Sequence, residues 1–271
     1  MNIGVFDSSL GGLAILKEIL IKLPEYNYVY LGDNARVPYG GRSPEIIYEF
    51  TAKAVDFLAS KQCSLIILAC NTATAAALKK LQQEYVPRHH PTCKVLGVIL
   101  PAVEAIKAGN AKKVGVIGTY TTIESKSFVR EIHKVLPKAH VYQQACPLLV
   151  PIIEEGELEW EGLCLILEKY LRPFSKKKID SLVLGCTHYG LIEKIIQKII
   201  GPHVSLISEG SVVAQKLKEY LQLHVEIATK LSKTGRRSYY ATDLNVRYEK
   251  LTKFFLGSEF RKTDRLQLVH I

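Results

Sequence analysis

The stretches "LIILACNTAT" (residues 65–74) and "LVLGCTHYG" (residues 182–190) share one pattern. In each, a short apolar run reaches a small residue, then a cysteine, and then polar residues. Short apolar runs bounded by turn-forming residues are typical of strands buried on both faces of a sheet. The two stretches therefore predict two buried strands, each with a cysteine, Cys70 or Cys186, at its carboxyl end.

The rest of the chain alternates between short apolar runs and helical patterns. Helices are predicted at 44–60, where apolar residues recur at helical spacing after Pro44, and at 191–200. Strands separated by helices are typical of a parallel sheet. Besides 65–69 and 181–185, strands are predicted at 3–6, 28–32, 95–99, 114–118 and 204–208.

A faint internal repeat suggests how the chain is divided. "IGVFDSS" (3–9) resembles "VGVIGTYTT" (114–122), and each is followed further on by one of the two cysteine strands. We therefore predict an α/β fold of two pseudo-symmetric, doubly wound domains with mostly parallel sheets and the active site in the cleft between them. The first domain is expected to comprise residues 1–97, joined by the segment 209–271 packing back on it, and the second 98–208.

The composition limits the class of protein. The chain of 271 residues is 48% apolar and 23% charged, which is typical of a globular protein. No apolar run approaches the roughly 18 residues of a membrane span, and "MNIGVFDSS" lacks the basic region of a secretory signal. We therefore expect a cytoplasmic protein without a membrane partner, with its six cysteines as free thiols in the reducing cytosol. None of them forms a C-x-x-C pair, so the sequence does not support a zinc ribbon or a thioredoxin-like motif.

The net charge of +10 is unevenly distributed. Ten of the 36 Lys and Arg residues, but only four of the 26 Asp and Glu residues, lie in 229–271. Such a segment is compatible with contact to DNA or another anionic surface. No nucleic-acid-binding motif accompanies it, so nucleic acid is not the partner we expect.

The polar loops at the strand ends point to a small-molecule site. In parallel sheets, ligands bind beyond the carboxyl ends of the strands, and the motifs G-x-G-x-x-G and G-x-x-x-x-G-K-[ST] are both absent. Two thiols flanking one cleft could remove a hydrogen from one face of a carbon and return it to the other, because a thiol, with a pKa of about 8.5, serves as acid or base with little adjustment. Nearby groups that could move protons or orient the sulfurs are Asp7, Glu154 and His188.

Structural roles are the alternatives for these residues. Each cysteine could be a small buried apolar residue, and we expect a structural rather than a functional role for Cys63, Cys93, Cys146 and Cys164. Asp7 could cap a helix, Glu154 could be a surface carboxylate, and His188 could be a hydrogen-bonded loop residue. A metal site formed by Cys70, Cys186 and His188 lacks an obvious fourth ligand, so neither a metal nor a cofactor is expected.

Six stretches resemble the cofactor-independent glutamate racemases of the aspartate/glutamate racemase superfamily. In order along the chain they are "GVFDSSLGGL" (4–13), "YLGDNARVPYG" (30–40), "ACNTATA" (69–75), "GVIGTYTTIES" (115–125), "ACPLLVPIIEEG" (145–156) and "LVLGCTHYG" (182–190). The resemblance implies two pseudo-symmetric domains, an activity that interconverts L- and D-glutamate and supplies D-glutamate for peptidoglycan, and a homodimer.

The resemblance also implies residue roles. Cys70 and Cys186 would be the acid/base thiols, with Cys70 deprotonating D-glutamate and Cys186 deprotonating L-glutamate. Asp7 would assist Cys70, and Glu154 and His188 would assist Cys186. The substrate would be contacted by Asp7, Ser8, Tyr39, Gly40, Asn71, Thr72, Thr119, Thr122, Thr187 and His188.

The chain departs from the family pattern at a few loop positions. Ser9 and Gly190 stand where the family usually has Gly and Pro, and Asn34 replaces a usual Thr or Ser. A serine would strain the first loop if position 9 needs a positive φ. Two other functions stay open from the sequence: a racemase of aspartate or another amino acid, and a regulatory binding protein that uses the basic segment 229–271.

Overall fold

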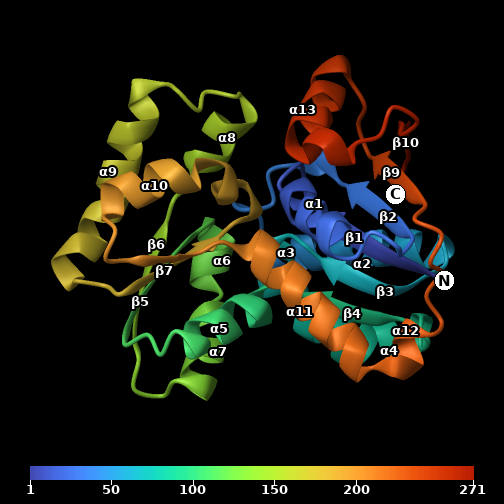
Figure 1. Cartoon of the computed structure of the whole chain (residues 1–271), viewed down its shortest axis with the longest axis horizontal. Coiled ribbons are helices and arrows are strands. Elements are labelled where there is room, and N and C mark those ends of the chain that lie inside the picture. Colours follow the sequence, from blue (N-terminus) through green and yellow to red (C-terminus); the bar gives the residue numbers. More distant parts are fainter.

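The structure, a computed structural model, describes residues 1–271 and contains two separate sheets (Figure 1). The first has six strands in the order β10-β9-β2-β1-β3-β4, and the second has four in the order β6-β5-β7-β8. Every strand pair is parallel, which confirms the predicted α/β class with mostly parallel sheets. The strands are β1 Asn2–Asp7, β2 Tyr28–Gly32, β3 Cys63–Leu68, β4 Lys94–Gly97, β5 Lys113–Gly118, β6 His140–Ala145, β7 Ser181–Gly185, β8 Ser205–Ile207, β9 Arg237–Ala241 and β10 Leu266–Leu268.

Helices cover both faces of the six-stranded sheet, and this unit is called lobe 1. Successive side chains of a strand point to opposite faces, so Val5 of β1 joins one apolar cluster and Phe6 the other. Val5 packs in the cluster formed by α1, α11 and α13, whereas Phe6 packs in that formed by α2 and α3. The helices are α1 Gly12–Lys22, α2 Pro44–Ser60, α3 Asn71–Lys80, α4 Val86–His89, α11 Glu209–Leu223, α12 Val225–Ala228 and α13 Val246–Leu256.

The four-stranded sheet is also covered on both faces, and this unit is called lobe 2. α5 and α7 pack with Val114 and Val116 of β5 on one face. α9 and α10 pack with Ile117 of β5 and Leu182 of β7 on the other. The helices are α5 Ile99–Ala108, α6 Tyr120–Glu124, α7 Ser127–Val135, α8 Leu149–Glu154, α9 Glu161–Lys177 and α10 Glu193–Ile200.

The central strands of the two sheets occupy equivalent positions. In lobe 1, β1 lies between β2 and β3, and in lobe 2, β5 lies between β6 and β7. β3 leads directly to Cys70 and β7 to Cys186. The repeat seen in the sequence thus corresponds to the two central strands, β1 and β5. The neighbouring strand that precedes a cavity cysteine is β3 for β1 and β7 for β5.

The chain crosses between the lobes twice. α5 follows β4 of lobe 1 but contributes Ala102 and Ile106 to the core of lobe 2. α11 returns, contributing Val213 and Leu217 to the core of lobe 1, and β9 and β10 extend the sheet of lobe 1 (Figure 1). This packing supports a division into 1–97 with 209–271 and 98–208, and these boundaries stay a prediction.

The elements that the sequence did not predict lie mostly at sheet edges. All seven predicted strands are present, and α2 has the predicted bounds. The expected helix 191–200 begins later, at Glu193, after a 3-10 helix at Thr187–Ile192. The strands β6, β9 and β10 were not predicted, because they carry polar or charged residues and two of them are edge strands, for which a continuous apolar run is not required.

Two adjacent phenylalanines of α13 test how the basic segment is attached. Phe255 is 3% exposed in the core of lobe 1, and Phe254 is 59% exposed. Phe255→Ala is expected to lower the free energy of unfolding by about 3–5 kcal/mol, the usual cost of removing a buried aromatic ring. The matched control Phe254→Ala should stay within about 0.5 kcal/mol of the wild type. Equal effects of both substitutions in urea unfolding would contradict this packing.

Candidate active site

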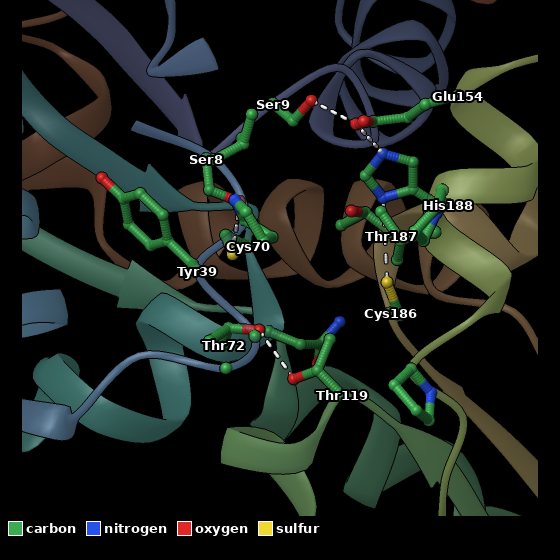
Figure 2. Close-up of a pocket in the computed structure, with 18 of the residues that line it drawn as sticks. Ser8, Ser9, Tyr39, Cys70, Thr72, Thr119, Glu154, Cys186, Thr187 and His188 are labelled. Atoms are coloured by element: carbon green, nitrogen blue, oxygen red, sulfur yellow. Dashed lines mark hydrogen bonds and ion pairs between the residues drawn. The ribbon is translucent and has the colours of Figure 1, made fainter. Parts of the chain in front are cut away.

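A cavity of ≈ 450 Å³ lies between the lobes, at the carboxyl ends of their central strands (Figure 2). It is lined by eleven of the predicted site residues, which come from both lobes. The structure therefore brings together strand ends that are far apart in the sequence. These residues are Ser8, Tyr39, Gly40, Cys70, Asn71, Thr72, Thr119, Glu154, Cys186, Thr187 and His188.

Cys70 lies where β3 ends and α3 begins. Its Sγ accepts a hydrogen bond from the backbone N–H of Ala73 at 3.5 Å and lies 3.3 Å from Ser8 Oγ. Burial, and next the nearby Asp7 carboxylate, raise the pKa of the Cys70 thiol to about 12. Cys70 is therefore a protonated thiol at neutral pH in the absence of a ligand.

Cys186 has a different electrostatic environment. Its Sγ lies 3.7 Å from His188 Nδ1, and His188 Nε2 lies 3.0 Å from Glu154 Oε1. Although burial opposes a charge on His188, its hydrogen bonds with Cys186 and Glu154 prevail and raise its pKa to about 10. The imidazolium that results lies beside Cys186 Sγ. Burial likewise opposes the charge on Glu154, but the bonds from His188 and Ser9 lower its pKa overall.

Hydroxyl groups join the lobes on the side of Cys70. Thr72 Oγ1 of lobe 1 lies 3.0 Å from Thr119 Oγ1 of lobe 2, which in turn lies 3.0 Å from Thr122 Oγ1. The carbonyl oxygen of Gly40 accepts from the N–H of Thr121 at 3.1 Å. A Cβ at Gly40 would lie 2.7 Å from Thr119 Cβ, so the absence of a side chain lets this loop approach lobe 2.

Asp7 and Thr122 lie behind the lining of the cavity rather than in it. Both side chains are fully buried, and neither lines the cavity. Asp7 Oδ2 accepts from the N–H of Ser9 at 2.9 Å, whereas its Oδ1 has no hydrogen-bond partner. Burial raises the pKa of Asp7, although His188 opposes the shift. Their direct contact with a substrate stays a prediction, and their positions favour a supporting role.

Comparison with known proteins identifies the family. A sequence model of the Asp/Glu/hydantoin racemase family matches residues 4–217. The chain belongs to this family. It is 38% identical over 269 residues to a glutamate racemase of Syntrophus aciditrophicus, covering 98% of this chain and 96% of that protein. It is 40% identical over 260 residues to a glutamate racemase of Aquifex aeolicus, covering 96% and 95%.

The fold is also that of the racemase family. The crystal structure of glutamate racemase from Francisella tularensis in complex with D-glutamate has a TM-score of 0.87 and 34% identity to this chain. The match covers 99% of this chain and 97% of the other. The resemblance and the two-domain fold expected from the sequence are thereby confirmed.

Several residues of the site were not predicted from the sequence. Glu209, at the start of α11, is fully buried behind the cavity and accepts a hydrogen bond of 2.6 Å from Asn71 Nδ2. Tyr39, although predicted, donates its hydroxyl to Asp33 and so lines the cavity with its ring. An apolar wall is formed by Val37, Pro38, Pro147, Val150 and Pro151.

No group of three or more His, Cys, Asp or Glu side chains is arranged to hold a metal ion. None of the helices has the length and apolar character needed to cross a membrane.

The buried Glu209 predicts a pH dependence of stability. Burial raises its pKa from 4.5 to about 8, so between these values the folded protein binds more protons than the unfolded chain. The contribution of Glu209 to stability therefore falls as the pH rises through this range, and each pKa unit corresponds to about 1.4 kcal/mol. Glu209→Gln can still accept from Asn71 but does not titrate. We expect it to raise the urea midpoint at pH 8.5 and to have little effect near pH 5.

The comparison with the wild type across pH decides whether this is correct. A gain in stability that is the same at both pH values would mean that Glu209 does not change its ionisation on folding.

Proposed function

We propose that the protein is a glutamate racemase that interconverts L- and D-glutamate by proton transfer at two thiols. The observation that carries the proposal is that Cys70 and Cys186, from opposite lobes, line one cavity. The relatives named glutamate racemase, which match nearly the whole chain, support glutamate as the substrate. The α-carbon of a bound substrate would lie between the two sulfurs.

The unequal environments of the thiols suit a two-base reaction. The reaction needs one thiolate and one thiol at the start, and the imidazolium of His188 beside Cys186 and the protonated Cys70 fit this requirement. The Cys186 thiolate takes the α-proton of L-glutamate, and the electron pair of the C–H bond moves toward the carboxylate. Cys70 then gives its proton to the opposite face, forming D-glutamate. D-glutamate reacts by the same steps reversed.

The carbanionic intermediate needs stabilisation by donors around the substrate carboxylate. Backbone N–H groups at the first turn of α3 and the hydroxyls of Thr72 and Thr187 surround the cavity near the two sulfurs. Such preorganised donors favour the charge that develops on the carboxylate. Contacts between the lobes limit the access of water, which strengthens these interactions.

The roles assigned to the predicted site residues form part of this proposal. Cys70 and Cys186 transfer protons, Asp7 supports Cys70, and Glu154 and His188 support Cys186. We also propose that the protein is a cytoplasmic homodimer that supplies D-glutamate for peptidoglycan. The substrate contacts are Ser8, Tyr39, Gly40, Asn71, Thr72, Thr119, Thr187 and His188, with Asp7 and Thr122 acting from behind the lining.

A binding role for the basic segment 229–271 is the alternative from another class of protein. Several of its arginines bind within the chain: Arg237 pairs with Glu259 at 3.0 Å, and Arg247 with Glu155 at 2.9 Å. Salt-sensitive DNA binding that survives loss of both cysteines would favour this alternative. The structure offers it less support than racemisation, because the segment forms two strands and a helix of lobe 1.

Circular dichroism of purified protein with pure L-glutamate and no added cofactor tests the proposal. The optical signal of the amino acid should decay to zero, because the two enantiomers are equally stable. The same assay with L-aspartate separates glutamate racemisation from racemisation of the shorter substrate. A stable signal with L-glutamate would contradict the proposal.

Variants that lack one of the two cavity cysteines should separate the two half-reactions. In heavy water, Cys186→Ser should incorporate deuterium into D-glutamate much faster than into L-glutamate, because the remaining Cys70 faces only one side of the α-carbon. Cys70→Ser should show the opposite preference. A serine hydroxyl is too weak a base at neutral pH to replace the missing thiolate. Exchange of the same enantiomer by both variants, measured by NMR, would contradict the assignment of one thiol to each face.

A further inference from the structure

Ser9, a residue without an assigned role, connects the two lobes at the active site. It follows β1 in lobe 1, and its hydroxyl donates a hydrogen bond across the cavity to Glu154 Oε1, at the end of α8 in lobe 2 (Figure 2). The same oxygen lies 3.0 Å from His188 Nε2. One carboxylate oxygen therefore receives a hydroxyl from one lobe and an imidazole from the other.

The backbone of Ser9 is held firmly enough to fix the direction of its side chain. Its N–H donates to Asp7 Oδ2 at 2.9 Å, and its carbonyl oxygen accepts from the hydroxyls of Tyr30 at 2.8 Å and Tyr248 at 3.4 Å. Ser9 is 4% exposed and does not have a positive φ, so the strain considered from the sequence is absent. The backbone from which the Ser9 hydroxyl extends is thus held in place by lobe 1.

The end of α8 is bound by lobe 1 at a second point. Arg247 of α13 donates from its guanidinium to the carbonyl oxygen of Glu154 at 2.7 Å and pairs with Glu155 at 2.9 Å. Arg247 therefore holds the backbone of Glu154, while Ser9 holds its carboxylate. Because Glu154 binds His188, which lies 3.7 Å from Cys186 Sγ, the orientation of this imidazole depends on a contact from the opposite lobe.

We propose that Ser9 is a positioning residue that orients the Glu154–His188 pair toward Cys186 when the two lobes are closed. The inference rests on the proposed two-thiol racemisation. Ser9 acts through Glu154 and His188, and it affects the proton transfers of Cys186 rather than those of Cys70. Closure of the lobes and assembly of the Cys186 acid/base group are then one event.

The neighbouring serine supplies a matched control. Ser8 Oγ lies 3.3 Å from Cys70 Sγ, and Figure 2 shows the Ser8 side chain directed toward Cys70 and the Ser9 side chain directed toward Glu154. Ser8→Ala and Ser9→Ala each remove one hydroxyl from the same loop. A general disturbance of the loop would affect both thiols in either variant, whereas the proposed role affects only one.

The test uses deuterium exchange at the α-carbon of glutamate in the Cys70→Ser and Cys186→Ser variants, each of which keeps one of the two cavity cysteines. Adding Ser9→Ala to Cys70→Ser should slow the exchange carried out by Cys186 roughly tenfold, the scale of one hydrogen bond to a charged group. Adding Ser9→Ala to Cys186→Ser should change the exchange carried out by Cys70 by less than about twofold. Ser8→Ala, which also removes a proposed substrate contact, should slow the exchange carried out by Cys70 more than that carried out by Cys186, and Ser9→Thr, which keeps the hydroxyl, should restore most of the rate.

The outcomes separate this inference from the proposed function. If Cys70→Ser and Cys186→Ser, both with Ser9 intact, exchange neither enantiomer, the two-thiol function fails and the inference fails with it. If they exchange as expected but Ser9→Ala slows both half-reactions equally or slows neither, only the inference is overturned. A loss with Ser9→Thr as large as with Ser9→Ala would also overturn it. Thermal unfolding of each variant checks that the fold is retained.

Discussion

The site depends on the close approach of two strand ends that belong to different sheets. No single lobe contains both Cys70 and Cys186, so the cavity between them exists only while the lobes are in contact. Glycines permit this approach, because a Cβ at Gly11 would collide with Thr187 and His188. Hydrogen bonds then hold the contact on both sides: Thr72 with Thr119 near Cys70, and the links from lobe 1 to α8 near Cys186.

The symmetry of the fold does not extend to the electrostatics. Each cysteine follows an equivalent strand, but Cys70 lies between a serine hydroxyl and the first turn of a helix, whereas Cys186 lies beside a protonated histidine. A reaction between mirror-image substrates needs two opposed groups of the same chemistry in complementary protonation states. The fold supplies the opposition, and in the proposed mechanism the Glu154–His188 pair, present only beside Cys186, makes the two sites unequal.

The sequence predicted the parts of the molecule that are governed by local pattern. Apolar runs identified the central strands, and a cysteine directly after β3 and β7 identified the ends that meet. The sequence could not place β9, whose partner β2 lies some 200 positions away in the chain, or β10, which pairs only with β9. Glu209 was missed for a similar reason, because its neighbour Asn71 is distant in the sequence. The contact between Asp7 and a substrate was implied by the resemblance and stays a prediction, and the buried Asp7 side chain lies behind the residues that line the cavity.

The central claim, that two opposed groups exchange the α-proton on opposite faces, is tested most directly with the unmodified protein. L-glutamate is incubated in heavy water, and the two enantiomers are separated early in the reaction and analysed by mass spectrometry. The account predicts deuterium at the α-carbon of the D-glutamate formed, because its new proton comes from Cys70 after exchange with solvent, and little deuterium in the L-glutamate that remains. D-glutamate that keeps the original α-proton would mean that one group serves both faces, and would contradict the account.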